Sequence, residues 1–289
     1  MKLSICIPGY NRPAYLKWTL EHLSINLPEA EIIVSDDGST EDMTPAKLDR
    51  VRWVQQEHIG PFPNLRAALL EAQGQYAVYC ANDDYLLPDE IEKAIAYMDA
   101  HPECSAYIAP CEIYDEVSQR PFWNAFKCEE RDFAAADGVA LFNFIIEHHV
   151  WPEHIVYRTP VPIAERTRAY WCFTDIPDLI ETGYLHFSPR PFYRNLLVHP
   201  LDAEHARVQL GNVQCLTHFD EYRGGLEVMA YGLLGPQPYE VRKQINEMIS
   251  HFICHRMFNA SVLYERNGHH AEAEMLRKRI KVASPERDR

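Results

Sequence analysis

The chain has 289 residues, of which 47% are hydrophobic and 24% are charged, a balance typical of a folded globular protein rather than a disordered one. This length can bury one large core, or one domain with a smaller appendage. The formal net charge of −14 argues against general nucleic-acid binding, because such binding depends on a basic surface that follows the phosphates.

Eight cysteines are scattered along the chain without a Cys-x-x-Cys pair, which predicts a reduced protein without a zinc site. The apolar part of residues 1–8 is too short for a signal peptide, and no apolar run approaches the roughly 20 residues of a membrane span. We therefore expect a cytoplasmic protein. The basic residues at 277–281 suggest at most a peripheral contact with the inner face of a membrane, and a solvated helix C-terminus, where the helix dipole favours cations, explains them better.

The first 110 residues alternate short apolar runs with helical patterns. The runs that predict strands lie at residues 3–7, 31–35, 51–54, 76–80 and 105–108. The helical patterns between them begin at Pro13, at Asn64 as a cap, and at Pro88. A strand–helix–strand succession predicts parallel pairing with right-handed crossovers, so the strand ends should lie at one edge of a sheet.

The pattern changes beyond residue 114. Residues 115–135 are mixed and polar, which indicates a loop or hairpin, and Asp137 is expected to cap the next helix. Residues 148–199 are rich in proline, histidine and aromatic residues, and we expect a long functional loop there. Residues 238–281 have a helical pattern that Gly268 interrupts.

Polar clusters follow three of the predicted strands. They are Pro8-Gly9-Tyr10-Asn11-Arg12, Asp36-Asp37-Gly38-Ser39 and Asn82-Asp83-Asp84. Ligands of open α/β sheets bind at this edge, and paired carboxylates there suit Mg²⁺ or Mn²⁺ shared with a substrate diphosphate. The alternative is purely local, because the second cluster is also a good turn sequence and an Asp pair before a helix supplies favourable N-terminal charge.

With these three clusters in this order, the chain resembles the family 2 glycosyltransferases of GT-A fold. Residues 4–12, 32–40 and the Asp-x-Asp-like 82–84 carry the resemblance, which is firm over residues 1–110 and loose beyond them. It implies an α/β fold of the Rossmann-like nucleotide-diphospho-sugar transferase type, with a mixed, mostly parallel sheet flanked by helices. The implied parts are a nucleotide-sugar-binding half (1–114), an acceptor-binding and catalytic half (115–235) and a helical extension (236–289).

The resemblance also implies roles for the residues that follow the strands. Tyr10 is expected to stack on the nucleotide base, with Pro8 shaping its loop. Asp37, beside Asp36, is expected to accept a hydrogen bond from a pyrimidine ring N–H. The remaining residues expected near the nucleotide are Asn11, Arg12, Asn64 and Arg66, although Arg66 fits equally well as a surface helix residue.

The metal and the ribose are expected at the third cluster. The resemblance implies that Asp84 binds Mn²⁺ or Mg²⁺ and that Asp83 contacts the ribose, while Asn82 marks a departure from the fully acidic motif. His199 and His205 are candidates for a further metal ligand, because some relatives supply one from a C-terminal loop. The alternative for a lone loop histidine is simple exposure to solvent.

An inverting transferase needs a carboxylate that takes the proton of the acceptor hydroxyl. The resemblance suggests Asp175 for this role, with Asp178 as the second choice, whereas the same stretch before Pro177 would also suit a helix cap. The aromatic-rich residues 151–154 and 170–171 are expected either to line the acceptor side or to belong to the core.

We therefore expect an inverting, metal-dependent glycosyltransferase of polysaccharide biosynthesis. Its donor would be a UDP- or dTDP-linked sugar, and its acceptor a hydroxyl of a glycan, a lipid-linked saccharide or a small molecule. One alternative is a non-catalytic sugar-nucleotide or glycan-binding protein on the same scaffold. Another is a sugar nucleotidyltransferase, which would require a glycine-rich loop with a basic residue where residues 8–12 stand.

Overall fold

A central sheet organises the protein, whose computed structural model describes residues 2–162, 169–202 and 218–283. Within these residues the sheet has eight strands in the order β3-β2-β1-β4-β10-β6-β11-β9. In chain order the strands are β1 (Leu3–Gly9), β2 (Glu31–Asp36), β3 (Val51–Gln55), β4 (Tyr76–Tyr79), β6 (Cys104–Ile108), β9 (Arg131–Phe133), β10 (Ile155–Arg158) and β11 (Tyr184–Phe187).

Strand direction decides which residues reach the edge of this sheet. Strands β3, β2, β1 and β4 are parallel to one another, whereas β10 is antiparallel to both β4 and β6. β10 therefore begins at the edge where β1, β2 and β4 end. Residues that follow the parallel strands meet residues that precede β10 at this edge.

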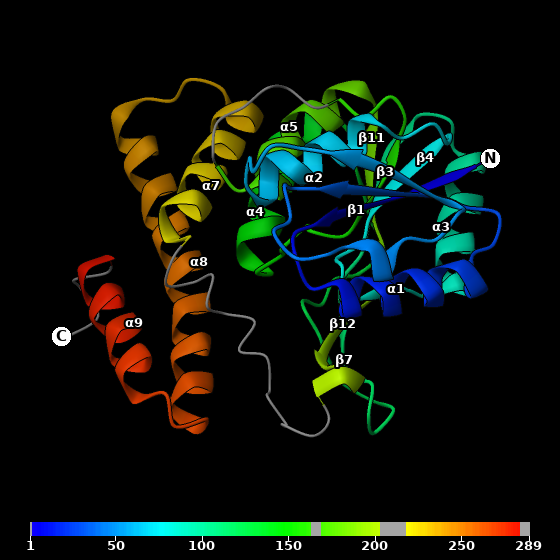
Figure 1. The fold of residues 1–289 in the computed structure, drawn as a ribbon. Helices are drawn as coiled ribbons and strands as arrows, with labels where there is room; N and C mark the ends of the chain where they lie inside the picture. Colours follow the sequence, from blue (N-terminus) through cyan, green and yellow to red (C-terminus); the bar gives the residue numbers. More distant parts are fainter. Residues whose placement is uncertain (1, 163–168, 203–217, 284–289) are drawn as a thin grey trace.

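Helices cover both faces of the sheet (Figure 1). Helices α1 (Pro13–Asn26) and α3 (Pro88–Ala100) pack on one face, and α2 (Pro61–Leu70), α4 (Gly138–Glu147) and α5 (Trp171–Thr182) on the other. Ile32, Ile33 and Val34 are fully buried, as expected for consecutive residues of a parallel strand covered on both sides.

A smaller sheet lies beside the end of β4. Its strands are β5 (Tyr85–Leu86), β12 (Tyr193–Val198), β7 (Cys111–Asp115) and β8 (Arg120–Asn124), in that order. β12 pairs antiparallel with β5, with Tyr193 opposite Leu86. This pairing brings β12 directly against the third polar cluster. Short 3-10 turns occur at Thr44–Ala46, Ala135–Asp137 and Pro200–Asp202.

Three helices form the C-terminal end of the described chain: α7 (Phe219–Leu234), α8 (Tyr239–Arg266) and α9 (His270–Ala283). α7 packs on α4 and α5, α8 packs on α7, and α9 packs on α8 at the outside of the molecule (Figure 1). Phe252, Ile253 and Met257 of α8 join the core that covers the second face of the sheet. None of the helices in the described parts of the chain has both the length and the hydropathy to cross a bilayer.

The predicted strands of the first 110 residues are confirmed, and so are the helices at Pro13 and Pro88 and the two C-terminal helices separated at Gly268. The predicted hairpin in 115–135 is formed by β7 and β8, although it begins earlier, at Cys111. Asp137 does precede α4, but its carboxylate accepts a hydrogen bond from Ala134 N (2.9 Å) rather than capping α4.

Three local predictions were wrong. α2 begins at Pro61, so Asn64 lies inside its first turn and does not cap it; Gly60, at φ 94°, precedes the helix instead. α5 begins at Trp171, so Asp175 lies in its second turn and Pro177 lies inside the helix. Residues 148–199 are not one long loop, since they contain β10, α5, β11 and most of β12.

The close approach of Gly183 to β6 offers a test of this packing. A Cβ atom at Gly183 would lie 2.3 Å from the carbonyl oxygen of Glu103 and 3.1 Å from the nitrogen of Ser105. We expect Gly183→Ala to destabilise the protein by about 1–3 kcal/mol, because backbone atoms must shift to make room. The free energy of unfolding in urea measures this effect.

Gly224→Ala is the matched control. A Cβ atom there, within α7, would meet only the Cβ of Ala169 at 3.7 Å. Because alanine favours a helix interior by up to about 1 kcal/mol over glycine, this variant should be as stable as the wild type or more so. An unchanged unfolding midpoint for Gly183→Ala would show that the contact is not as tight as described.

Candidate active site

The loop after β1 is hydrogen-bonded to the loop after β2. Asn11 and Arg12 both adopt positive φ, at 54° and 60°. The side-chain oxygen of Asn11 accepts hydrogen bonds from Thr40 N (2.8 Å) and Glu41 N (3.0 Å), and Asn11 N donates to Ser39 Oγ (2.7 Å). Asn11 therefore joins the first two polar clusters into one surface.

The two carboxylates of the second cluster are buried, and both accept hydrogen bonds from backbone N–H groups. Asp36 Oδ1 accepts a hydrogen bond from Ser39 N (3.0 Å). The two oxygens of Asp37 accept from Ile59 N (2.7 Å) and Gly60 N (3.0 Å) at the start of α2. The hydrogen bond from Ser39 N to Asp36 confirms the predicted turn. Recognition of a nucleotide base by Asp37 stays a prediction.

An exposed aromatic pair lies over this turn. Tyr10, directly after β1, is 41% exposed, and its ring packs on that of His58 with centroids 4.6 Å apart. His58 Nδ1 lies 3.2 Å from Asp37 Oδ2. Pro8 lies within β1 and sets the backbone that leads to Tyr10. His58 was not predicted as a site residue.

Asn64 and Arg66 of α2 point inward rather than to the surface. Asn64 is 2% exposed, and its Nδ2 donates to Ser35 O (2.8 Å) and, at 3.4 Å, to Gly9 O. It therefore fixes the ends of β1 and β2 relative to each other. Arg66 reaches α5, where it forms an ion pair with Asp175, so the surface interpretation of Arg66 was wrong.

The third cluster has one partly buried carboxylate, Asp83, and one fully buried carboxylate, Asp84. Asp83 Oδ2 forms an ion pair with Arg12 Nη1 at 2.8 Å, which links the first cluster to the third. Asp84 is 2% exposed and accepts hydrogen bonds from Tyr193 OH (2.9 Å), Asn195 Nδ2 (3.0 Å) and Leu196 N (2.8 Å) of β12. Burial, and then the charge of Asp83, raise the pKa of Asp84. Asn82 is partly exposed beside them.

His199 directly follows β12. It is fully buried between the rings of Tyr15 and Trp18, at centroid distances of 4.8 and 4.7 Å. Its Nδ1 accepts a hydrogen bond from Leu201 N, and its Nε2 has no hydrogen-bond partner. His205 lies outside the described residues. In the described part of the chain, no three His, Cys, Asp or Glu side chains are already arranged to hold a metal.

Asp175 is buried beneath the edge rather than exposed on it. It is 3% exposed, and its Oδ1 lies 2.8 Å from Arg66 Nη2, which also donates to Thr174 Oγ1. Tyr157 OH, from the middle of β10, donates to Asp175 Oδ2 at 3.5 Å. Burial raises the pKa of Asp175 to about 6, while the charge of Arg66 acts in the opposite direction.

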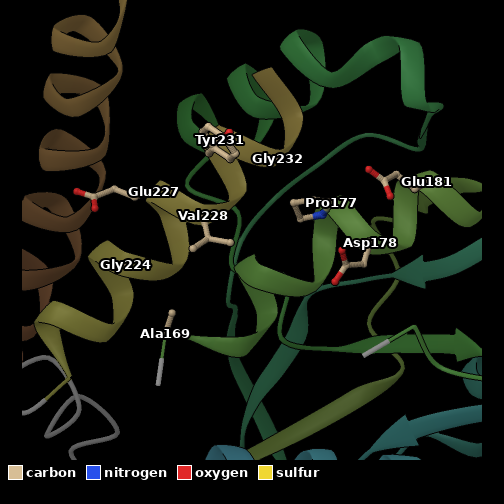
Figure 2. A pocket seen from close by; sticks show the side chains of 9 residues that line it. All are labelled: Ala169, Pro177, Asp178, Glu181, Gly224, Glu227, Val228, Tyr231 and Gly232. Carbon is tan, nitrogen blue, oxygen red and sulfur yellow. The ribbon is translucent and has the colours of Figure 1, made fainter. Parts of the chain in front are cut away.

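Asp178, one turn further along α5, lies at a pocket between α5 and α7. It lines a pocket of about 620 Å³ between α5 and α7, with Glu181 and Glu227 also on its wall (Figure 2). The remaining wall is formed by Ala169, Pro177, Gly224, Val228, Tyr231 and Gly232. The structure does not bring Asp178 together with the polar clusters at the strand ends.

Aromatic side chains connect the third cluster to the start of α5. The ring of Tyr79, at the end of β4, lies parallel to that of Tyr193 (6.1 Å, 16°) and contacts Trp171 edge-on at 5.9 Å. Next to Trp171, Tyr170 OH donates a hydrogen bond to Glu153 Oε1 at 2.6 Å. Trp151, Tyr170 and Trp171 are all buried in the hydrophobic core, so the core alternative is confirmed for these side chains.

Comparison with known proteins places this arrangement in a family. Residues 4–171 match the model of the family described as glycosyl transferase family 2. This match spans more than half of the chain, so the chain belongs to glycosyl transferase family 2, as its motifs predict.

Among curated relatives, the chain is 31% identical over 126 residues to an uncharacterized protein of Mycobacterium tuberculosis, covering 39% of this chain and 36% of that protein. It is 29% identical over 111 residues to the poly(ribitol-phosphate) beta-N-acetylglucosaminyltransferase TarS of Staphylococcus aureus, covering 35% of this chain and 19% of TarS. The matches thus cover only about a third or less of these relatives.

Solved structures confirm the predicted fold. The structure of Staphylococcus aureus TarS 1–349 in complex with UDP-GlcNAc matches with a TM-score of 0.56 at 16% identity, covering 98% of this chain and 84% of that one. Its complex with UDP matches with a TM-score of 0.51 at 19% identity, covering 96% and 90%. The protein therefore has a GT-A fold, a mixed α/β sheet flanked by helices with a helical C-terminal region.

The buried pair of Arg66 and Asp175 yields a second prediction. Arg66→Met leaves the Asp175 carboxylate buried without its counter-charge, and breaking such a pair costs about 3–5 kcal/mol. We expect the free energy of unfolding to fall by about that amount. Urea denaturation followed by circular dichroism measures it.

The double variant Arg66→Met, Asp175→Asn is the control for charge. It removes both charges and keeps a side chain that can bond to Tyr157, so it should recover at least half of the lost stability. If Arg66→Met alone is within about 0.5 kcal/mol of the wild type, then the pair is not a buried ion pair in solution.

Proposed function

We propose that this protein is a glycosyltransferase whose donor is a nucleotide-diphosphate sugar. The observation that carries the proposal is the convergence of three strand-end clusters on one edge, where Asn11 joins the first two and Arg12 pairs with Asp83 of the third. Ligands of α/β sheets bind at this edge, and membership of glycosyl transferase family 2 supports transfer of a sugar as the reaction.

The base of the nucleotide would stack on Tyr10. This ring is exposed and packs on His58, whose Nδ1 lies 3.2 Å from Asp37 Oδ2, so an aromatic base would find one flat surface and one acceptor region. A nucleoside diphosphate of uracil or thymine suits such a site. The bound UDP-GlcNAc of the structural neighbour TarS supports a UDP-linked donor.

A divalent cation, Mn²⁺ or Mg²⁺, would bind with the diphosphate beside Asp84. Mg²⁺ is commonly held by one or two carboxylates together with substrate phosphates, so the described residues fit without a preformed cage. Asp83 and Asp84 would supply hard oxygen ligands, and Asp84 would share its carboxylate with the three donors of β12. His199 has a buried Nε2 without a hydrogen-bond partner. When bound, the ion would neutralise the charge that develops on the leaving diphosphate.

The acceptor would be a hydroxyl group of a glycan, a lipid-linked saccharide or a small molecule, and the transfer would invert the anomeric centre. Asp175 is the base that the sequence suggests, and its pairing with Arg66 favours a structural role. We also propose that residues 1–114 bind the donor and residues 115–235 the acceptor, with 236–289 as an extension. A non-catalytic sugar-nucleotide-binding protein is the second candidate, since Tyr10 and Asp37 would serve it equally.

Donor binding is tested directly by thermal shift. We expect UDP to raise the melting temperature in the presence of Mn²⁺ and to raise it less after chelation, because a ligand that binds only the folded protein stabilises it by mass action. Asp84→Asn should abolish the Mn²⁺-dependent part of the shift. Asp89→Asn, an exposed change at the start of α3, is the matched control and should keep it.

The outcomes separate the two candidates. If no nucleoside diphosphate changes the melting temperature with or without metal, the whole proposal is wrong. If nucleotides bind but no donor is turned over with water or with any alcohol, the binding-only candidate is favoured.

The aromatic pair yields a separate prediction. Tyr10→Ala should weaken UDP binding about tenfold, because stacking on a base is worth about 1–3 kcal/mol. Tyr10→Phe should bind as the wild type does, since the stacking surface is kept. Isothermal titration calorimetry gives both dissociation constants, and equal affinities for the wild type and Tyr10→Ala would place the base elsewhere.

A further inference from the structure

We propose that Phe122 and Trp123 of β8 form an aromatic platform that binds a saccharide acceptor several sugar units away from the hydroxyl that receives the transferred group. This inference rests on the proposed function and narrows its acceptor from any hydroxyl compound to a saccharide chain. β8 is the outer strand of the small sheet, whose order is β5-β12-β7-β8. On this strand Trp123 is 52% exposed and Phe122 is 38% exposed.

The register of the small sheet connects Trp123 with the third polar cluster. Asn195 of β12 lies opposite Ile113 of β7, and Ile113 lies opposite Trp123. Residues opposite one another in neighbouring strands project from the same face of a sheet. The side chain of Asn195 donates a hydrogen bond to Asp84 Oδ2 at 3.0 Å. Trp123 therefore projects from the face of the small sheet that contacts Asp84, two strands away from β12, which lies beside β7 (Figure 1).

This row of side chains becomes more exposed towards the outer strand. Asn195 and Ile113 are partly exposed, and Trp123 is exposed. Neighbouring strands lie about 4.8 Å apart, so the two steps from Asn195 to Trp123 span about 10 Å. One sugar ring is too small to cover this distance. A saccharide that reaches both the candidate donor site and Trp123 must therefore contain more than one sugar.

A β-bulge places Phe122 beside Trp123. Trp123 lies opposite Ile113, whereas Pro121 lies opposite the next residue of β7, Tyr114. Phe122 is therefore an extra residue in β8, and a bulge of this kind changes the direction of a side chain locally. The ring centroids of Phe122 and Trp123 are 5.7 Å apart, with an angle of 47° between the planes. The two rings together form an open apolar surface.

The backbone of β8 is poorly suited to pairing with a strand of another molecule. Pro121 has no N–H group to donate, and the bulge at Phe122 interrupts the regular ladder. Proteins use both features to prevent edge-to-edge pairing of sheets. The partner that covers the two rings is therefore expected to contact the side chains and not the backbone.

The size of the aromatic platform favours a saccharide over a protein partner. Two aromatic side chains bury at most about 500 Å², and these two are already partly covered, whereas a stable protein interface takes about 800 Å² from each partner. A sugar ring has an apolar face of C–H groups and hydroxyls at its rim. An exposed aromatic ring can cover that face while the hydroxyls stay in water.

Binding of defined oligosaccharides to the whole protein tests the aromatic platform. An array of oligosaccharides of known structure, incubated with the wild type in the presence of UDP and Mn²⁺, identifies the chains that bind. Calorimetry then compares one such chain with its own monosaccharide unit. We expect the chain to bind at least about tenfold more tightly, because only the chain reaches the aromatic anchor.

Trp123→Ala should weaken binding of the oligosaccharide about tenfold, the loss that is common for a tryptophan anchor. Its affinities for the monosaccharide and for UDP should equal those of the wild type. Trp123→Phe keeps a ring and should retain most of the affinity for the chain. Tyr239→Ala is the matched control, because it removes a similarly exposed aromatic side chain (68%) at the start of α8. Thermal unfolding checks that each variant folds.

The possible failures are distinguishable. If no oligosaccharide binds to the wild type, or if Trp123→Ala binds the chain as well as the wild type does, the aromatic platform is wrong and donor binding still stands. If the wild type binds no nucleotide, the proposed function itself is wrong. A wild-type dimer that dissociates on Trp123→Ala, seen by analytical ultracentrifugation, would assign the two rings to a second copy of the chain and overturn the saccharide.

Discussion

The arrangement of the candidate site depends on the buried carboxylate of Asp84. Its oxygens accept three hydrogen bonds from β12, so one side chain joins the end of β4 in the large sheet to the small sheet. A carboxylate removed from water is costly unless donors of this kind surround it. Because these donors hold the loop after β4, the neighbouring Asp83 is presented at the edge, where it pairs with Arg12.

Most of the donor half could be predicted from sequence because its determinants are local. Consecutive apolar residues such as Ile32 and Ile33 predict strands covered on both faces, and the polar residues after them necessarily collect at the edge of a parallel sheet. Asp36 and Asp37 also behave as a local pattern suggests, since their contacts lie in the turn and at the start of α2. The base-binding and metal-binding roles go beyond these contacts and remain predictions.

The second half could not be predicted in the same way because its contacts join distant segments. Thr174 and Asp175 before Pro177 have the composition of a helix cap, yet α5 begins four residues earlier, where Trp171 and Phe173 enter the core. Packing of that face outweighs the local cap signal. The partner of Asp175 is Arg66 on α2, 109 positions earlier. No sequence pattern predicts an ion pair between residues so far apart.

Strand direction explains why the residues around β10 were hard to place from the sequence. A search of residues that follow predicted strands assumes that every strand runs the same way. β10 runs opposite to its neighbours, so the residues before it reach the edge while those after it are carried to the other side of the sheet. Glu153 and Tyr170 flank 16 intervening residues, and the antiparallel strand together with the start of α5 brings them back together. In a mixed sheet of this kind, the residues before the antiparallel strand therefore reach the same edge as the residues after the parallel strands.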